Sequence, residues 1–258
     1  MIQVSFSSFI ARLMLALGIL AGCSCTEHRQ EAPDQVTDTI LSGASFYASP
    51  FGKRTQVKLA DGTRVMLNSG SQLWVDTGFG QSGRSVRLSG DALFTVEKGE
   101  KEFRIRTPHL VLTTAGAVMR VSGYDQSAGE ETLLLSGNLH VVKSYYSELD
   151  HEPYDLKSGE MVMMNKDIDL MEKETFDTAE LEPWAAGRLE FREMTFQQVV
   201  NTLKGWYNTE VEVSGNIPAD IRFTGSFRHP SLQEVLAALA KQGKFRYSAK
   251  RDPVEIKF

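Results

Sequence analysis

The sequence predicts a mainly β protein with an α+β end: an all-β roll or sandwich, solenoid-like in its repetition, followed by a small split-βαβ domain. Two observations predict this fold class. From residue 54 to about 165, short alternating segments flank glycines in a recurring pattern, and after residue 179 a strand–helix–strand order occurs twice. These patterns divide the chain into a signal segment at 1–22, a flexible tether at 23–45, a β domain at 46–178 and a C-terminal βαββαβ domain at 179–258.

The first segment has the features of an export signal. An apolar run at 13–22 is too short to span a bilayer, which needs roughly 20 apolar residues, and it ends in Leu20-Ala21-Gly22-Cys23. This ending resembles the processing box of bacterial lipoproteins, in which the cysteine thiol takes the lipid. We therefore predict that Cys23 is lipidated and that the mature chain is anchored on the periplasmic side of a membrane. The alternative is an uncleaved single span in the inner membrane, with Arg12 inside it at an energetic cost.

Composition excludes several classes of protein. The formal net charge is −5, with acidic and basic residues mixed and no basic block, so we expect no nucleic-acid partner. Only one cysteine, Cys25, follows Cys23, and a disulfide framework is therefore not available. Residues 26–45 are polar and poor in large apolar residues, as expected of a tether.

The β domain is predicted from glycines placed between short strand-like segments. The turn glycines are Gly62, Gly90, Gly116, Gly137 and Gly159. Asp61-Gly62 is the strongest tight-turn signal of the set. The segments that follow, such as 64–67 and 92–96, alternate apolar and polar residues, which indicates sheets with one buried face. The uneven glycine spacing favours a compact roll or sandwich over a regular β-helix.

The C-terminal domain is predicted from two similar halves. Thr195 with Gln198, and Ser231 with Glu234, are two capping boxes that begin helices. The first helix has one apolar stripe, formed by Phe196, Val199, Val200, Leu203, Trp206 and Tyr207, and the second repeats it with Leu232, Val235, Leu236 and Leu239. We expect Gly243 to end the second helix and both helices to cover one face of a sheet.

The chain resembles the FecR family. In the β domain the resemblance lies in KLADGTRVMLNSGSQL (58–73), RSVRLSGDALFTVEK (84–98), FRIRT (103–107) and LLLSGNLHVV (133–142), in the expected order. Residues 184–213 and 223–247 resemble the C-terminal domain of the family's Bacteroidetes branch, which is similar to the short N-terminal fold of secretins and TonB-dependent proteins.

The resemblance implies a regulator of sigma factors in cell-surface signalling that binds the N-terminal signalling domain of a TonB-dependent outer-membrane transporter. Two small sheet domains can associate through an exposed edge strand. We predict that VEIKF at 254–258 is such an edge, with Val254, Ile256 and Phe258 as the partner-binding residues. The alternative is that VEIKF is a paired interior strand.

The sequence also departs from the family pattern. Standard members begin with a cytoplasmic sigma-binding domain and a membrane span, for which the residues before Cys23 leave no room. We therefore expect this chain to reach a sigma factor only indirectly, through another membrane protein. Ala117 and Met119 replace the family's usual threonine and aromatic residue, so local packing should differ there.

No pattern predicts an enzyme, a cofactor or a metal site. The five histidines, His28, His109, His140, His151 and His229, have no HxH or HExxH spacing. Asp91 and Glu97 are close in sequence but are expected to be solvated surface residues. A second functional class stays open, a lipoprotein that binds a glycan or another envelope protein without a role in transcription. Trp74 or Trp184 would then stack on a sugar, although Trp184 fits better as a wedge between the two domains.

Overall fold

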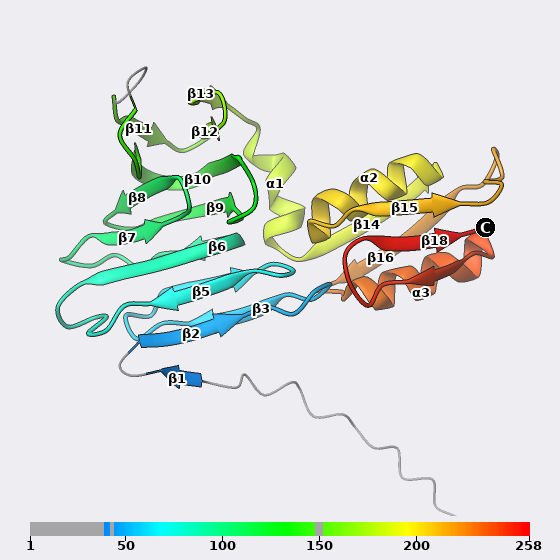
Figure 1. Cartoon of the computed structure of the whole chain (residues 1–258), viewed down its shortest axis with the longest axis horizontal. Helices are drawn as coiled ribbons and strands as arrows, with labels where there is room; N and C mark the ends of the chain where they lie inside the picture. Colours follow the sequence, from blue (N-terminus) through cyan, green and yellow to red (C-terminus); the bar gives the residue numbers. More distant parts are fainter. Residues whose placement is uncertain (1–38, 42–43, 148–151) are drawn as a thin grey trace, which may run out of the picture. The chain divides into compact units, whose positions relative to one another are not determined.

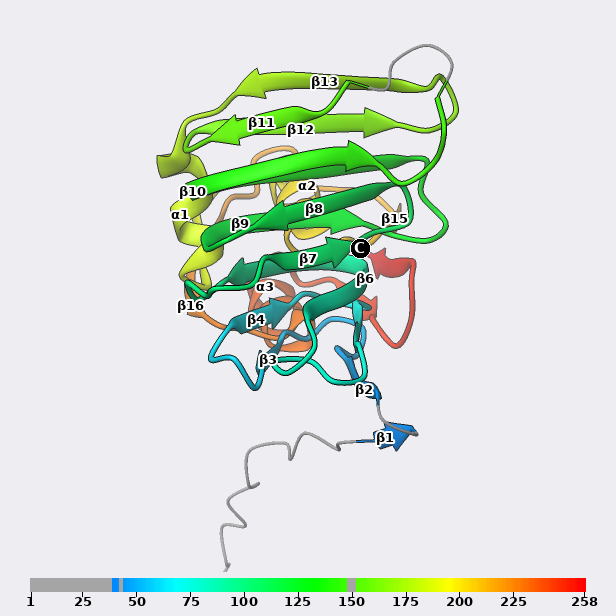
Figure 2. The same ribbon diagram turned by 90° about the vertical axis from the view of Figure 1, so that its left-hand side faces the viewer.

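The β domain is a roll made of two hydrogen-bonded layers (Figures 1 and 2). The computed structural model describes residues 39–41, 44–147 and 152–258. Layer A contains β1 (Thr39–Leu41), β2 (Ala44–Ala48), β5 (Gln72–Val75), β7 (Phe103–Arg106), β8 (Leu110–Thr114) and β11 (Tyr154–Lys157). Layer B contains β3 (Thr55–Lys58), β4 (Arg64–Leu67), β9 (Ala117–Gly123), β12 (Glu160–Asn165) and β13 (Leu170–Thr175).

Two long strands belong to both layers. The first half of β6 (Arg84–Thr95) pairs with β5 and β7 in layer A, and its second half pairs with β4 and β9 in layer B. β10 (Gly129–Lys143) crosses in the opposite direction, from β9 and β12 to β8 and β11. Because both layers share these strands, their inward side chains enclose a single core, which includes Leu73, Leu88, Phe94, Phe103, Leu112, Met119 and Val141.

The predicted glycine turns prove to be of two kinds. Gly62 lies in a tight turn between the paired strands β3 and β4, as predicted. Gly90 and Gly137 lie inside β6 and β10, where these strands pass from one layer to the other. Gly116 and Gly159 lie between strands of different layers, so all four glycines are corners of the roll, and only for Gly90 and Gly137, which lie within strands, is the predicted turn between strands wrong.

Gly90 shows why such a corner requires glycine. Its φ is +138°, and a Cβ atom built on it would lie 2.4 Å from the Cβ and 2.6 Å from the Cα of Ser71. The two chain segments therefore approach too closely for any side chain at position 90. The backbone N–H of the next residue, Asp91, donates a hydrogen bond to the hydroxyl oxygen of Ser71 at 2.9 Å.

The sheet extends into the predicted tether. β1 and the beginning of β2 lie within 23–45, and they pair with each other before β2 pairs with β5. Backbone pairing causes this difference, because strand addition to a sheet does not require large apolar residues. The predicted signal segment, Cys23 and most of the tether lie outside the described residues.

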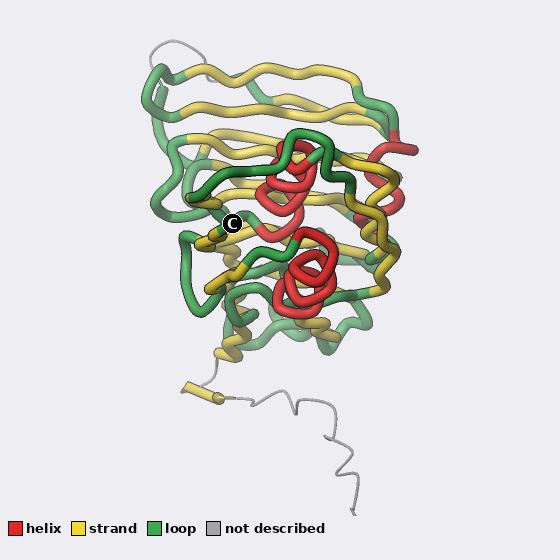
Figure 3. Tube along the Cα trace, turned by 90° about the vertical axis from the view of Figure 1, so that its right-hand side faces the viewer, coloured by secondary structure: helices red, strands yellow, loops and turns green. Residues whose placement is uncertain are grey.

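The C-terminal region follows α1 (Thr178–Ala185), and its two helices are seen together in Figure 3. Its elements are β14 (Arg188–Met194), α2 (Phe196–Tyr207), β15 (Val211–Ser214), β16 (Phe223–Arg228), α3 (Leu232–Gly243), β17 (Arg246–Ser248) and β18 (Val254–Lys257). Both predicted capping boxes are present, at Thr195 and at Ser231, and the predicted apolar stripes of both helices are buried. The predicted fold class is confirmed, since a large β domain is followed by a small α/β region.

Two details of this region differ from prediction. Its strands form two sheets, β14–β16 and β15–β18–β17, and α3 contacts strands of both, so the helices do not cover one face of one sheet. Gly243 is the last residue of α3, and Lys244 has the left-handed conformation that ends the helix, with φ of 53°. Position 243 requires glycine for a different reason: a Cβ there would lie 2.7 Å from Phe245 and 3.0 Å from Phe223.

Residues 38–258 form one compact unit that contains two hydrophobic cores. The second core fills the C-terminal region and also includes Leu133 and Met161, which point outward from layer B. The residues that directly follow them on the same strands, Leu134 and Val162, point inward to the first core. Layer B is therefore buried on both faces here, and the division at residue 178 stays a prediction.

Candidate functional site

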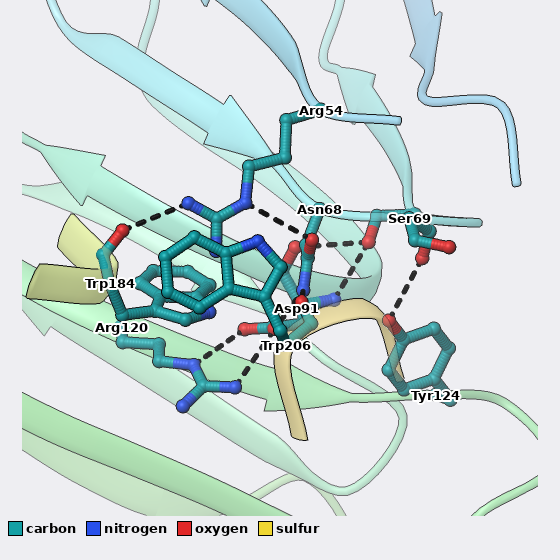
Figure 4. Close-up of polar contacts among 9 residues, drawn as sticks. Arg54, Asn68, Ser69, Asp91, Arg120, Tyr124, Trp184 and Trp206 are labelled. Carbon is teal, nitrogen blue, oxygen red and sulfur yellow. Dashed lines mark hydrogen bonds and ion pairs between the residues drawn. The ribbon is translucent and has the colours of Figure 1, made fainter. Parts of the chain in front are cut away.

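A cluster of charged and aromatic side chains joins the C-terminal region to the β domain (Figure 4). We call it the arginine–tryptophan junction and define it as Arg54, Asn68, Asp91, Arg120, Trp184 and Trp206. Arg54 directly precedes β3, Asn68 directly follows β4, and Asp91 and Arg120 lie on β6 and β9. Trp184 lies on α1 and Trp206 near the end of α2, so the junction joins two helices to the strands of layer B.

Asp91 is the buried anion of the junction. Its side chain is only 1% exposed, and it accepts hydrogen bonds from Nε and Nη2 of Arg120 at 2.9 and 3.0 Å. The amide of Asn68 donates to Asp91 Oδ2 at 2.7 Å and to the backbone carbonyl of Trp206 at 2.9 Å. Asn68 therefore connects this ion pair directly to the C-terminal end of α2. A two-pronged arginine–carboxylate pair fixes geometry as well as charge.

Arg54 contacts both tryptophans of the junction. Its guanidinium carbon lies 4.2 Å from the ring centre of Trp184 and 4.4 Å from that of Trp206. Nη1 donates to the carbonyl oxygen of Trp184 at 2.9 Å, and Nε donates to Asn68 Oδ1 at 3.3 Å. Nη2 is buried without a hydrogen-bond acceptor among the described residues, so the two aromatic rings supply the remaining stabilisation of this cation.

Burial controls the electrostatics of the junction. It lowers the pKa of Arg54 to about 10, even though Asp91 acts in the opposite direction. Burial also opposes the charge of Arg120, but the adjacent carboxylate of Asp91 raises the pKa of this arginine above its ordinary value. Arg120 lies 4.3 Å from the ring centre of Trp184, so Trp184 contacts both cations. Burial likewise raises the pKa of the neighbouring Glu131.

The junction is suited to holding two parts of the chain together. The contacts that cross from layer B to the helices are the hydrogen bonds of Arg54 and Asn68 to the carbonyls of Trp184 and Trp206, together with the guanidinium groups stacked on both rings. Leu133 and Met161 of layer B extend the contact with apolar packing against the core that contains Leu181 and Trp184. In the described ranges no group of three His, Cys, Asp or Glu side chains is placed to hold a metal ion.

The predicted partner-binding strand is not an edge. β18 is the middle strand of its sheet, pairing in parallel with β15 and antiparallel with β17, so the edge prediction for VEIKF is wrong and the interior alternative holds. Val254 and Ile256 are fully buried. Phe258 packs edge-on against Phe196, with ring centres 4.9 Å apart. The alternation of VEIK is the same for a central and an edge strand, which is why the sequence did not separate them.

Other predicted residues have mixed outcomes. Asp91 is buried and ion-paired, not solvated, while Glu97 is exposed as expected. Trp184 is buried against Arg54 and Arg120, which excludes it as an exposed stacking surface and agrees with the predicted wedge. Trp74 is only partly buried.

Sequence reasoning missed Arg54, Asn68 and Arg120. The sequence did indicate that the layer carrying these residues is buried on both faces. Uninterrupted apolar runs are typical of such strands, and two of them occur, LLL at 133–135 and MVMM at 161–164. Charged residues on neighbouring strands of such a layer must then be paired or stacked.

The comparisons with known proteins agree with this architecture. The family model described as FecR protein matches residues 45–140, and the one described as FecR, C-terminal matches residues 188–256. Together these segments make up more than half of the sequence. The chain belongs to the FecR family. The FecR match lies on the roll as far as β10, and the C-terminal match runs from β14 to β18.

Two crystal structures of a Parabacteroides distasonis protein described as an anti-sigma factor resemble this FecR-family chain. One is 25% identical with a TM-score of 0.56, and it covers 83% of this chain and 98% of the other. The second is 25% identical with a TM-score of 0.55, covering 82% and 97%. No curated protein sequence matches the chain significantly.

Proposed function

We infer that this protein is a non-enzymatic regulatory module in sigma-factor signalling, which receives its input by binding another protein. Membership in the FecR family and the likeness to the anti-sigma factor support the regulatory role. The partner we propose is the N-terminal signalling domain of a TonB-dependent outer-membrane transporter. The sigma factor would be reached only through another membrane protein.

The exposed edge β15 is the proposed docking strand. It pairs with β18 on one side only, and three of its four residues are exposed. Val213 on this strand is 37% exposed, and Ile217, just beyond it, is 41% exposed. A shallow hollow of about 390 Å³ lies beside it, lined by residues of β15, β17 and β18 that include Tyr247. An edge strand with apolar side chains next to a hollow suits the addition of a partner strand.

Backbone direction identifies the atoms available for that pairing. The carbonyl groups of Glu210 and Ser214 accept hydrogen bonds from Val254 and Phe258, toward β18. Because successive residues of a strand face opposite sides, the N–H and C=O groups of Val211 and Val213 point away from β18. These groups are the ones that a partner strand would pair with.

The junction gives such binding a route to the β domain. α2 directly precedes β15 in the chain, and the carbonyl of Trp206 near its end is held by Asn68. A partner on β15 would therefore act on a region that the junction fixes to layer B. We propose that Cys23 carries a lipid that holds the module on the periplasmic side of a membrane. Within the described ranges, none of the three helices is both long and apolar enough to cross a bilayer.

Val213→Pro is the decisive test of the docking strand. Proline removes an outward N–H, which an edge strand tolerates, and leaves the hydrogen bonds to β18 intact. Tagged signalling domains of the transporters encoded in the same genome are used to capture the full chain, and Val213→Ala serves as the matched control because it keeps the N–H. We expect capture of the natural chain and of Val213→Ala, and loss of capture for Val213→Pro at an unchanged thermal midpoint.

The outcomes separate two errors. Capture of Val213→Pro at the same level as the natural chain would overturn β15 as the docking strand. Failure of every signalling domain to capture the natural chain, together with unchanged sigma-dependent transcription after deletion of the gene, would overturn the proposed function itself.

A further inference from the structure

The outer face of layer A carries a row of aromatic and arginine side chains that the proposed function does not use. Hydrogen-bonded register places Phe46 opposite Trp74, Trp74 opposite Arg87, and Arg87 opposite Arg106. Arg104 lies two residues from Arg106 on β7 and on the same face, since Phe103 and Ile105 point into the core. We call Trp74, Arg87, Arg104 and Arg106 the arginine row.

The arginine row is a concentration of positive charge on an acidic protein. The chain has a formal net charge of −5, yet three arginines lie on adjacent strands within this patch. Arg87 pairs with Asp125 at 3.4 Å and is still 54% exposed. Arg104 and Arg106 are exposed and form no ion pair with any residue of the described ranges. Other carboxylates near the row are Asp76, which directly follows β5, Glu102, which directly precedes β7, and Asp155, which pairs with His140 at 2.8 Å.

This arrangement is unfavourable without an anionic ligand. Like charges that face each other across neighbouring strands destabilise a sheet, and Arg87 faces Arg106 directly. The arginine side chains are not needed for strand pairing here, because β6 and β7 are each hydrogen-bonded through their backbones to a strand on both sides. Guanidinium groups bind carboxylates and phosphates through two parallel hydrogen bonds. The row therefore fits a ligand that carries repeated negative charges.

Trp74 defines the second property of the ligand. Its ring is partly exposed, lies 5.3 Å from the ring of Phe46, and has Arg87 at 5.0 Å from its centre. The large apolar side chains that are most exposed in the described chain are Tyr146, Ile168, Leu170, Val213 and Ile217, and none belongs to this row. The apolar side chains of this face, Phe46, Trp74, Val111 and Val142, are all partly buried, so the face offers no fully exposed apolar centre of the kind that a protein interface needs. A sugar ring, by contrast, has an apolar face for an indole and hydroxyl groups for the polar surroundings.

We propose that the outer face of layer A binds an acidic polysaccharide, with Trp74 stacked on a sugar ring and Arg87, Arg104 and Arg106 paired with its carboxylates. The hollow of about 720 Å³ next to Arg104, bordered by Thr113, Asn138 and His140, continues the polar surface for further sugar units. This surface is separate from β15, and the proposal does not depend on the partner proposed above.

The test uses the full chain with polygalacturonate as the acidic polysaccharide, dextran as the neutral one and poly-L-glutamate as an acidic polypeptide. Binding is followed by tryptophan fluorescence and by co-sedimentation. The variants are Trp74→Ala and the double variant R104Q/R106Q, with R64Q/R228Q as the matched control because both of these arginines are exposed elsewhere. Thermal midpoints establish that each variant is folded.

We expect polygalacturonate to bind and dextran not to bind, with affinity that falls as salt rises. R104Q/R106Q and Trp74→Ala should each weaken binding at least tenfold, and R64Q/R228Q should leave it unchanged. Equal binding by R104Q/R106Q and the control, or no binding of polygalacturonate to the natural chain, would overturn the proposal. The proposal would also be overturned if poly-L-glutamate bound as tightly as polygalacturonate and its affinity did not change in Trp74→Ala, since the face would then recognise acidic polypeptide.

Discussion

The two outer faces of the roll share two strands and have opposite character. β6 and β10 contribute to both layers, yet their outward residues differ: Arg87 projects from the half of β6 in layer A, and Leu93 and Leu133 project from the halves in layer B. The outer face of layer B packs against the core of the C-terminal region. The outer face of layer A exposes its arginines to solvent.

The comparison shows that arginine has two different functions in this fold. On layer A, Arg87 is half exposed and its ion pair with Asp125 is long, so this pair contributes little to stability. At the junction, Arg54 and Arg120 are largely buried and stacked on tryptophan, and Arg120 also pairs with the carboxylate of Asp91. Burial ties the junction cations to the packing of the fold, whereas exposure leaves those of layer A available for the proposed ligand.

Removing the anion of the junction should have the largest effect. Asp91→Ala leaves Arg120 buried without its partner, and we expect the free energy of unfolding in urea to fall by about 3–5 kcal/mol. Asp125→Ala removes the exposed partner of Arg87 on layer A, and its effect should stay below about 1 kcal/mol. Equal losses for the two variants would contradict the contrast between the faces.

Truncating an apolar residue on the covered face should rank next. Met161→Ala opens a cavity between layer B and the C-terminal core, which we expect to cost about 2–3 kcal/mol in urea unfolding. Val142→Ala makes a comparable change on the outer face of layer A, where the residue is already partly solvated, and should cost less than about 1 kcal/mol. A loss for Met161→Ala no larger than that for Val142→Ala would mean that this contact does not hold the C-terminal region.

Replacing the stacked arginine with lysine sharpens the comparison further. Arg54→Lys keeps the charge but loses the planar group between the two tryptophans and the hydrogen bond to the Trp184 carbonyl, so we expect a loss of about 1–2 kcal/mol. The near-ultraviolet circular dichroism of the tryptophans should weaken with it. Arg106→Lys, on layer A, should change stability by less than about 0.5 kcal/mol; a near-neutral Arg54→Lys would show that stacking is not what holds this cation.

The smallest effect concerns an ion pair of intermediate burial, Lys143 with Asp169 at 3.0 Å. Hydrogen bonds from Ser147, Tyr145 and Lys143 hold the pKa of Asp169 well below its ordinary value of 3.8. A carboxylate whose pKa is lower in the native state than in the unfolded state stabilises the fold fully at pH values above the unfolded-state pKa. This stabilisation is lost as the pH falls from the unfolded-state pKa toward the native-state pKa.

The thermal midpoint of the natural chain should therefore fall between pH 5 and pH 2 by more than that of Asp169→Asn, which has no such proton to bind. Parallel pH profiles for the two proteins would show that Asp169 does not contribute to acid unfolding.

Local patterns predicted the elements well, and long-range pairing escaped them. The capping boxes at Thr195 and Ser231 fixed the starts of α2 and α3, because each depends on residues three positions apart. The corners at Gly90 and Gly137 were predicted as turns between separate strands, since glycine with positive φ occurs in both and only the partner strands distinguish them. Trp184 was predicted as a wedge between the domains, but its partner Arg54 was not, because the two residues are 130 positions apart in sequence.

The double membership of β6 and β10 has a mechanical consequence. Each strand enters one layer and leaves through the other, so continuous hydrogen-bonded strands join the layers at these two crossings, in addition to side-chain packing and the connections at the other corners. A tensile load that draws the layers apart meets peptide bonds at these crossings. We therefore expect rupture under force to start at the strands that pair on one side only, β1 and β11 in layer A and β3 and β13 in layer B, and to peel inward from them.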